Sequence, residues 1–437
     1  MREPPPPPRA GCPAGPALTE AAAEEHAATA AFRTGVPGFV GAEVEWLVRR
    51  VTEPSRRVSP GGLAAAVAAA GAHTGGAPAG PDEPGWSTWL RHGRLTVTAG
   101  GAVTVSTPPS PGVDVCARRT SDDLANVRRA LRGAGLTPMN SALDPFRPPR
   151  RVLDSGRYAA MERYFDRSGP AGRWMMCSTA SVRVCLDAGQ DDDGPMGYRR
   201  RWALAHAIGP VLVAAFANSP LRLGRATGWK STRQALWLQL DPTRVTPPGG
   251  GDPRAAWARY ALDASVMAVR DDRSRWTVPA GVSFRGWLRS GRPRPATLAD
   301  LDDHLRTLFP PVRPRGHLEL RMIDGQLGDA WLVPLAVAAG LFGDARAGDE
   351  ALAATERVHA RAEPYHRGPW ARAARSGLGD PVLAEAALAC FMSAYEALGR
   401  QHASRDLRDV VAWFIERYVA RGRSPADDVL DTVDEFA

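Results

Sequence analysis

The stretch FVGAEVEWLV, residues 39–48, alternates apolar residues with small or acidic ones, as does a strand with one buried face. Glu43 and Glu45 lie on its second face, together with Gly41. Two carboxylates on one face repel each other unless a cation lies between them or water reaches both. The stretch therefore predicts either a cation-binding strand, for which Mg²⁺ is the hard ion suited to oxygen ligands, or a solvent-exposed strand face.

A second segment, Trp174 to Leu186, is predicted as one long strand with the same division into faces. Its polar face is made of Cys177, Thr179, Ser181, Arg183, Cys185 and Asp187. Such a face is either the floor of a substrate site or part of an edge strand, although an edge strand more commonly carries lysine, glutamate or threonine than two cysteines.

A third strand is predicted at HLELRMI, residues 317–323. One face carries His317, Glu319, Arg321 and Ile323, and the other carries Leu318, Leu320 and Met322. The Glu-x-Arg spacing places a possible metal ligand about 7 Å along the strand from a possible phosphate ligand. The alternative is an ordinary ion pair between neighbouring strands.

Mostly helices are predicted around these strands. A hairpin is expected at residues 94–106, with its turn at Gly100-Gly101. Helices are expected at residues 18–32, 60–70, 122–133, 198–217, 229–239, 252–269 and 297–308, and from Trp331 onward. The pattern predicts an α+β fold, with helices packed on one side of an antiparallel or mixed sheet and a helical C-terminal region. Residues 1–17 are expected to form a disordered proline-rich tail, and 18–437 a single domain whose part 327–437 is helical.

Composition limits the functions open to this chain of 437 residues. Its formal charge is +8, but 54 of its 55 basic residues are arginine and Lys230 is the only lysine, which indicates a GC-rich coding bias rather than a nucleic-acid surface. The five cysteines are too few and too scattered for a disulfide framework, which predicts that the protein is located in the reducing cytoplasm. The start of the chain has no secretory signal pattern, and the apolar run 204–217 is too short to cross a membrane. Neither nucleic acid nor a membrane is expected as a partner, and no oligomeric state is predicted.

A basic segment lies between the second and third strands, with Arg222, Arg225, Lys230, Arg233 and Arg244. Its GRATGWK, residues 224–230, is not a Walker A loop, because Trp229 stands where glycine is needed and the glycine spacing is too short. The segment is either a solvated basic face or a cluster of anion ligands. Carboxylates from separate strands together with anion ligands are what ATP-dependent activation of a carboxylate requires.

Five segments in order resemble the glutamate–cysteine ligases, in particular the actinobacterial branch that serves ergothioneine biosynthesis. They are GAEVE at 41–45, MCSTASVRVCLDAG at 176–189, ANSPLRLGRATGWKSTRQALWLQLDPTR at 217–244, WARYALDASVMAVR at 257–270 and FPPVRPRGHLELRMID at 309–324. The resemblance, which runs from about residue 20 to the end, implies a glutamine-synthetase-like sheet whose concave face binds Mg²⁺, ATP, glutamate and cysteine. It implies that the glutamate γ-carboxylate takes the γ-phosphoryl group of ATP and that the cysteine amine then displaces phosphate, giving γ-glutamylcysteine.

Residue roles follow from the same resemblance. Glu43, Glu45 and Glu319 would bind Mg²⁺, and Glu45 and Arg321 would be catalytic, Arg321 by stabilising charge on the transferred phosphoryl group. Thr179, Arg183, Cys185, Arg233 and Arg244 are the candidate substrate ligands, with the fork of Arg233 suited to the glutamate α-carboxylate. Lys230 and Arg321 are the candidate ATP ligands.

Several positions depart from the family pattern. The family form Glu-Pro-Gly-Gly-Gln-x-Glu-x-Ser corresponds to residues 98–106, in which Thr98 and Thr104 replace its two glutamates. The family form Val-Gln-Val-Asn-Leu-Asp corresponds to residues 182–187, in which Arg183 and Cys185 replace the glutamine and the asparagine. The site thus has two carboxylates fewer and one guanidinium more, and Arg183 could replace a metal by bridging Glu43 or Glu319. The alternative hypothesis is therefore a catalytically impaired homologue that binds a ligand or stabilises a partner.

Overall fold

The computed structural model describes residues 17–72, 86–270, 275–326, 328–360, 363, 365 and 367–434. Nearly all of the proline-rich segment expected to be a tail lies outside these residues. The division into a tail and a single domain therefore stays a prediction.

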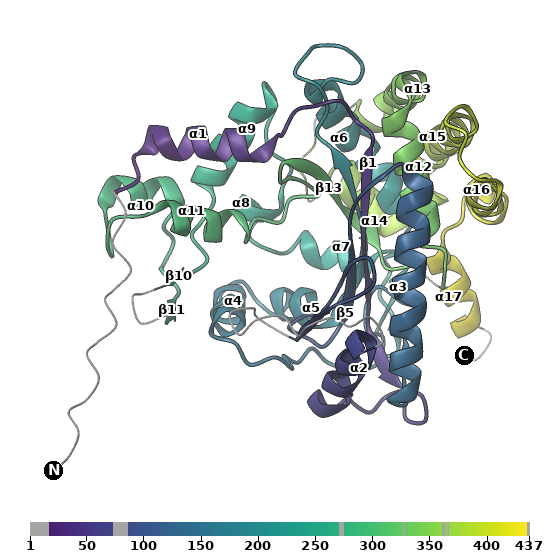
Figure 1. Ribbon diagram of the computed structural model, residues 1–437, viewed down its shortest axis with the longest axis horizontal. Coiled ribbons are helices and arrows are strands. Elements are labelled where there is room, and N and C mark those ends of the chain that lie inside the picture. Colours follow the sequence, from purple (N-terminus) through teal and green to yellow (C-terminus); the bar gives the residue numbers. More distant parts are fainter. Residues whose placement is uncertain are drawn as a thin grey trace.

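A seven-stranded sheet forms the centre of the molecule, in the order β12-β13-β7-β1-β5-β4-β3, and all of its pairings are antiparallel (Figure 1). Its strands are β1 (Phe39–Trp46), β3 (Ser87–Trp89), β4 (Arg94–Val97), β5 (Val103–Pro111), β7 (Ser181–Asp187), β12 (Val312–Pro314) and β13 (His317–Asp324). Three two-stranded pairs lie outside it: β2 (Val48–Arg50) with β6 (Leu136–Pro138), β8 (Leu221–Arg222) with β9 (Arg225–Ala226), and β10 (Val269–Arg270) with β11 (Trp276–Thr277).

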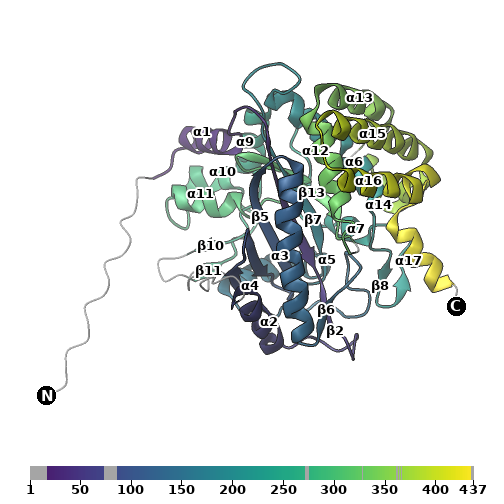
Figure 2. The same cartoon turned by 45° about the vertical axis from the view of Figure 1, so that its right-hand side comes forward.

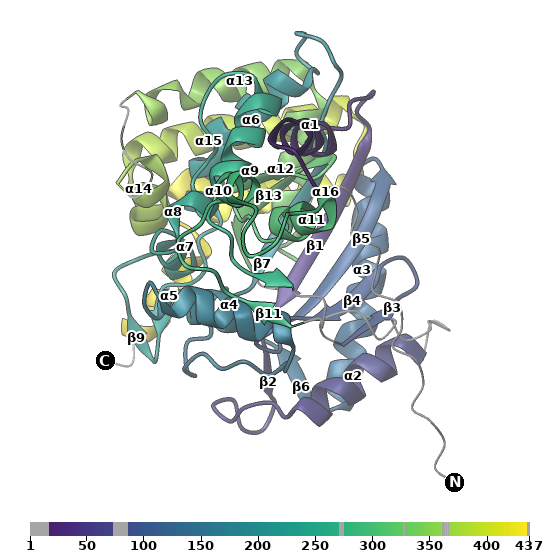
Figure 3. The same ribbon diagram turned by 90° about the vertical axis from the view of Figure 1, so that its left-hand side faces the viewer.

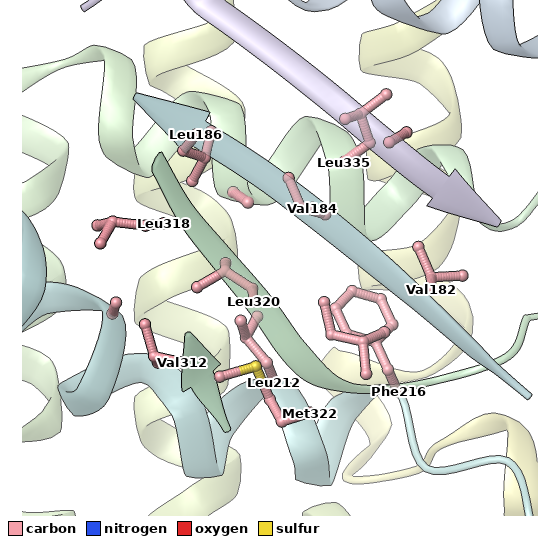
Figure 4. Packing of buried hydrophobic residues seen from close by; sticks show 14 of the residues in the cluster. Val182, Val184, Leu186, Leu212, Phe216, Val312, Leu318, Leu320, Met322 and Leu335 are labelled. Carbon is pink, nitrogen blue, oxygen red and sulfur yellow. The ribbon is translucent and has the colours of Figure 1, made fainter. Parts of the chain in front are cut away.

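One face of the sheet is apolar and is covered by α3 (Val113–Gly133), α6 (Tyr198–Ala215) and α12 (Leu332–Gly343). Figure 4 shows Val182, Val184 and Leu186 of β7 packed with Leu318 and Leu320 of β13, and Leu212 of α6 and Leu335 of α12 among them. Burial of this face explains the alternation read from the sequence, since every second residue of each strand enters the core. The predicted α+β class, built around an antiparallel sheet, is confirmed.

The opposite face carries the polar side chains of the central strands. Figure 3 views the molecule from this side, with several helices in front of the sheet. The helices on this side are α1 (Glu20–Ala31), α4 (Gly156–Asp166), α5 (Ala171–Ser178), α7 (Thr232–Trp237), α8 (Pro242–Val245), α9 (Pro253–Asp263), α10 (Phe284–Ser290) and α11 (Leu298–Leu305). At the lower edge, α2 (Pro60–Ala72) packs on α3.

The C-terminal part is helical, as predicted. It contains α13 (Ala345–Thr355), α14 (Pro369–Ser376), α15 (Pro381–Arg400), α16 (Arg405–Arg417) and α17 (Pro425–Asp434), with short 3₁₀ turns at Glu356–His359, Gly377–Gly379 and Val419–Arg421. Figure 2 shows α13, α15 and α16 stacked at one side of the sheet. Among the described residues α15 is the one helix long and apolar enough to cross a membrane, but half of its apolar window is buried against the protein, where it packs on α12 and α13. Its hydropathy is therefore that of a core helix.

The segment 174–186 is not one strand, and this prediction is wrong in its first half. Residues Ala171–Ser178 form α5, and only Ser181–Asp187 form a strand. All residues of α5 except Arg173 are buried, so its apolar residues show no period that would separate a helix from a strand. Cys177 and Thr179 therefore do not belong to the polar face of β7.

A bulge in β13 changes the face of Ile323. Leu320 pairs with Val184 and Ile323 with Val182, so two residues of β13 lie opposite the single residue Arg183. Ile323 consequently joins the apolar face rather than the face of His317, and Asp324 takes the polar side opposite Ser181. An extra residue of this kind cannot be recognised from a period-two pattern.

The predicted hairpin is confirmed, with Gly101 at φ 88° in the turn between β4 and β5.

A Cβ on the preceding Gly100 would lie 2.0 Å from the carbonyl oxygen of Cys177. We expect Gly100→Ala to lower the free energy of unfolding by about 1–3 kcal/mol, because backbone atoms have to move apart. Urea denaturation measures the loss. Gly61→Ala in α2, where a Cβ meets nothing within 4 Å, is the control and should cause no loss; equal losses in the two variants would contradict the steric explanation.

Candidate active site

Three neighbouring strands place four charged side chains on the polar face of the sheet. Glu43 and Glu45 come from β1, and Glu43 pairs directly with Arg183 of β7. Glu319 of β13 pairs with Cys185, the next residue of β7 on the same face. Because paired residues share a face, the carboxylates converge from both sides on the strand that carries Arg183. Glu43, Glu45 and Glu319 therefore lie on one face, around the strand that carries Arg183.

Arg183 lies at the centre of this group. Its Nη1 donates to Oε2 of Glu43 at 2.5 Å, its Nη2 lies 3.7 Å from Oε2 of Glu45, and its Nε lies 4.0 Å from Oε1 of Glu319. Burial alone would lower the pKa of Arg183, but the three carboxylates outweigh burial and raise it above its ordinary value. The guanidinium is therefore firmly charged and contacts all three glutamates.

Glu319 is the buried end of the cluster, with a side chain only 1% exposed. Its Oε2 accepts from Nε of Arg313 at 2.7 Å, and its Oε1 accepts from Nη1 of Arg321 at 2.7 Å. Burial would raise the pKa of Glu319, but Arg313, Arg321 and Arg183 together hold it well below the usual range. This carboxylate is ionised and both of its oxygens are occupied.

Arg313 is the member of this cluster that the sequence reasoning missed. It lies on β12, where it pairs with Glu319 across a hairpin that turns at Gly316, whose φ is 74°. The segment VRPRGHLEL contains the signal, because a turn at the glycine places residues 313 and 319 opposite each other. We name Glu43, Glu45, Glu319, Arg183, Arg313 and Arg321 the acid–arginine cluster.

The acid–arginine cluster opens to solvent at one end. The side chains of Arg183 and Glu43 are 21% and 24% exposed, whereas Glu319 is closed off. Glu45 lies between these extremes and accepts from Oγ of Ser181 at 3.1 Å. Thr104 of β5 lies directly opposite Glu45, and its buried hydroxyl has no hydrogen-bond partner. A ligand can therefore approach over Arg183 and Glu43.

A resident Mg²⁺ does not fit the carboxylates as they are arranged. Glu43 holds Arg183, and Glu319 holds two further arginines. Within the described residues no group of three or more histidine, cysteine, aspartate or glutamate side chains is placed to hold a metal ion. The three glutamates predicted to bind Mg²⁺ thus lie close together, but the guanidinium groups of arginines occupy the positions beside their oxygens that a metal ion would need.

Arg233 of α7 stabilises the bulge of β13 by hydrogen bonds to backbone carbonyl oxygens. Its Nη2 donates to the carbonyl oxygen of Arg321 at 2.8 Å, and its Nη1 lies 3.3 Å from that of Met322 and 3.4 Å from Oδ1 of Asp324. Asp324, which sequence reasoning also missed, is buried and accepts from Ser219 and Ser231 as well. Burial lowers the pKa of Arg233 and raises that of Asp324. In this arrangement Arg233 positions the backbone that carries Arg321.

Three other predicted residues are not brought into the cluster. Arg244 is fully buried and donates to the carbonyl oxygens of Thr307 and Ser265. Lys230 donates to Asp427 of α17 at 2.6 Å. Thr179 ends α5, and its hydroxyl donates to the carbonyl oxygen of Met175 at 2.7 Å. The structure therefore gives each of them a partner within the protein, so their predicted ligand roles gain no support from it.

Cys185 does lie beside the cluster, between Gly41 of β1 and Glu319 of β13. Burial raises the pKa of its thiol, and the nearby carboxylates of Glu43 and Glu319 raise it further. A Cβ at Gly41 would lie 3.3 Å from the Cβ of Cys185, so glycine leaves the space in front of this thiol open. Cys185 is thus a neutral thiol at the edge of the site.

Known proteins that resemble this chain identify its family. The model of glutamate-cysteine ligase family 2 (GCS2) matches residues 39–435. Glutamate–cysteine ligase EgtA of Mycolicibacterium smegmatis is 40% identical over 422 residues, which are 94% of this chain and 91% of that protein. Its counterpart in Mycobacterium tuberculosis is 40% identical over 350 residues, 78% of this chain and 77% of that protein. A solved bifunctional glutathione synthetase from Pasteurella multocida has a TM-score of 0.50 at 15% identity, covering 92% of this chain and 50% of that one, and shows the fold alone.

The chain belongs to glutamate-cysteine ligase family 2. The predictions of the family and of a ligase of this type are confirmed by the length of the match and by identity over most of the chain.

Proposed function

We propose that the protein joins the γ-carboxylate of L-glutamate to the amine of L-cysteine with cleavage of ATP to ADP and phosphate, through a γ-glutamyl phosphate. The acid–arginine cluster is the observation that carries this proposal: one sheet face of a glutamate–cysteine ligase family member holds ionised arginines beside carboxylates, open to solvent at one end. Phosphoryl transfer needs mainly positioning and neutralisation of charge, which fixed guanidinium groups supply.

Arg321 is the proposed ligand of the transferred phosphoryl group. One side of its guanidinium is held by Glu319, and its Nε is a buried donor without a hydrogen-bond partner. A buried donor left unpaired is costly unless a ligand takes it. Arg321 is further fixed by the bulge that Arg233 supports, so its direction is set before a substrate arrives. These are the properties of a preorganised anion ligand.

The finer details of the function rest on the similarity to the EgtA ligases. By that similarity, the product γ-glutamylcysteine would supply ergothioneine biosynthesis. The cytoplasm, where ATP and reduced cysteine are available, is the proposed location. Because arginines already neutralise the three glutamates, the roles proposed here belong to the chain's own residues, and no step is assigned to a resident Mg²⁺.

Incubation of the purified protein with glutamate, cysteine, ATP and Mg²⁺ should release ADP and a product with the mass of γ-glutamylcysteine. We expect Glu45→Gln to reduce the rate by roughly a hundredfold or more, because Arg183, the proposed phosphate ligand, loses one of the carboxylates that fix its position. Glu53→Gln is the matched control, since Glu53 pairs only with the partly exposed Arg50 and Arg56 among the described residues. A folded wild-type protein that forms no product would exclude the proposal and favour the impaired homologue.

A further inference from the structure

We infer that Arg183 is a built-in cation of this site, which holds Glu43, Glu45 and Glu319 together without a divalent metal and presents a positive charge to the phosphates of the substrate nucleotide. The part that concerns phosphates rests on the proposed function. The part that concerns the carboxylates rests on the geometry of the acid–arginine cluster alone.

The position of Arg183 is that of a shared counter-ion rather than of one partner in a surface pair. β7 lies between β1 and β13, so the arginine stands between carboxylates supplied by both neighbours. Its nitrogen atoms lie 2.5, 3.7 and 4.0 Å from oxygens of Glu43, Glu45 and Glu319 respectively. One guanidinium thus donates a hydrogen bond to Glu43 and lies at ion-pair distance from Glu45 and Glu319.

The charge balance of the cluster excludes an additional divalent cation. Its three glutamates face three arginines, so the group is neutral before any ligand binds. An Mg²⁺ ion placed among the glutamates would meet Arg183 at contact distance and would have to displace it. Charges of the same sign at such a distance repel, so Arg183 and the ion would compete for the same carboxylate oxygens.

The open end of the cluster gives Arg183 its second role. The side chain is 21% exposed beside Glu43, whereas Arg313 and Arg321 are 7% and 10% exposed. Arg183 is thus the arginine of this cluster that an incoming anion meets first. A guanidinium fork suits the oxygens of a phosphate, so nucleotide phosphates are the chemical class that this position would bind.

Binding of Mn²⁺ to the nucleotide-free protein, followed by electron paramagnetic resonance, tests the inference without turnover. Wild type should bind Mn²⁺ at the cluster only weakly. Arg183→Gln removes the counter-ion but keeps a side chain of similar length, and it should gain a site with affinity roughly tenfold or more above that of wild type. Arg183→Lys keeps the charge and should resemble wild type. Tight Mn²⁺ binding by wild type that Glu319→Gln abolishes would overturn the inference, as would equal binding by the wild type and Arg183→Gln.

Thermal unfolding supplies a second readout. The midpoint of wild type should be the same in EDTA and in MgCl₂, whereas the midpoint of Arg183→Gln should be lower in EDTA and should recover with MgCl₂. A wild-type midpoint that rises with MgCl₂, where the midpoint of Glu319→Gln does not, would overturn the inference even if Arg183→Gln did not fold. Both readouts use neither glutamate nor cysteine. Failure to form γ-glutamylcysteine therefore tests the proposed function, and the metal response separately tests the role of Arg183.

Discussion

Replacement of Glu319 by glutamine should lower the free energy of unfolding by about 3–5 kcal/mol. Glu319 is the shared partner of Arg313 and Arg321 and lies near Arg183, and its side chain is 1% exposed. The amide cannot balance these buried positive charges, and desolvated charges without a counter-ion are costly. Urea denaturation of the wild type and Glu319→Gln measures the difference.

Glu43→Gln is the matched control, because Glu43 also pairs with an arginine but has a side chain 24% exposed. Water screens the charge that this change leaves behind, so we expect a loss of about 1 kcal/mol or less. Equal losses in the two variants would show that burial of Glu319 does not determine the stability of the cluster.

The pKa of Glu319 gives this prediction a pH dependence of definite sign. The folded protein holds this pKa below its ordinary value of 4.5, so the unfolded chain binds a proton more readily than the folded one. The stabilisation is therefore fully present above about pH 4.5 and is lost as the pH falls toward the folded-state pKa. As the pH falls below 4.5, the free energy of unfolding of the wild type should decrease more steeply than that of Glu319→Gln. Identical acid slopes would contradict the lowered pKa.

Arg233→Met should cost about 3–5 kcal/mol of folding free energy even in the absence of every substrate. The change removes the donors that hold the carbonyl oxygens of Arg321 and Met322, and it leaves the buried carboxylate of Asp324 without its arginine. Arg233→Lys should recover part of the loss, because a lysine supplies the charge without the planar fork. Denaturation of the substrate-free proteins measures these losses.

Arg222→Met provides the control for Arg233. Arg222 is exposed and stacks at 5.8 Å over the ring of Trp174, so its loss should cost about 1 kcal/mol or less. If Arg233→Met keeps full stability but raises the Michaelis constant for glutamate, Arg233 is a substrate ligand as the family resemblance implies, and its structural role described above is wrong.

The faces of the central strands could be predicted from the sequence because side chains alternate along a strand wherever one face is buried. This rule placed Glu43 and Glu45 together, placed Arg183 beside Cys185, and placed Glu319 beside Arg321. Strand order could not be predicted in this way. That β7 lies between β1 and β13 decides that Arg183 contacts carboxylates from both sides, and order follows from packing across the whole chain rather than from local pattern.

The roles of buried arginines were the least predictable part. Arg233 and Arg244 have the same residue type and the same basic surroundings in the sequence as exposed Arg222 and Arg225. Only the tertiary structure shows that one supports the bulge of β13 and the other binds carbonyl oxygens of Thr307 and Ser265. A guanidinium can satisfy backbone carbonyls as well as ligands, so an arginine in a motif does not by itself indicate a substrate contact.

The order of strands in the sheet also determines when the site can exist during synthesis of the chain. β1 leaves the ribosome early, but its neighbour β7 is made much later. Glu43 can therefore contact Arg183 only after a further 140 residues have been added to the chain. Glu319 and Arg321 arrive later still, on β13, which ends at Asp324. Until that strand has been made, the nascent chain carries Glu43, Glu45 and Arg183 without the buried half of their cluster. Substrate binding at the cluster must therefore wait until about three-quarters of the protein has been translated.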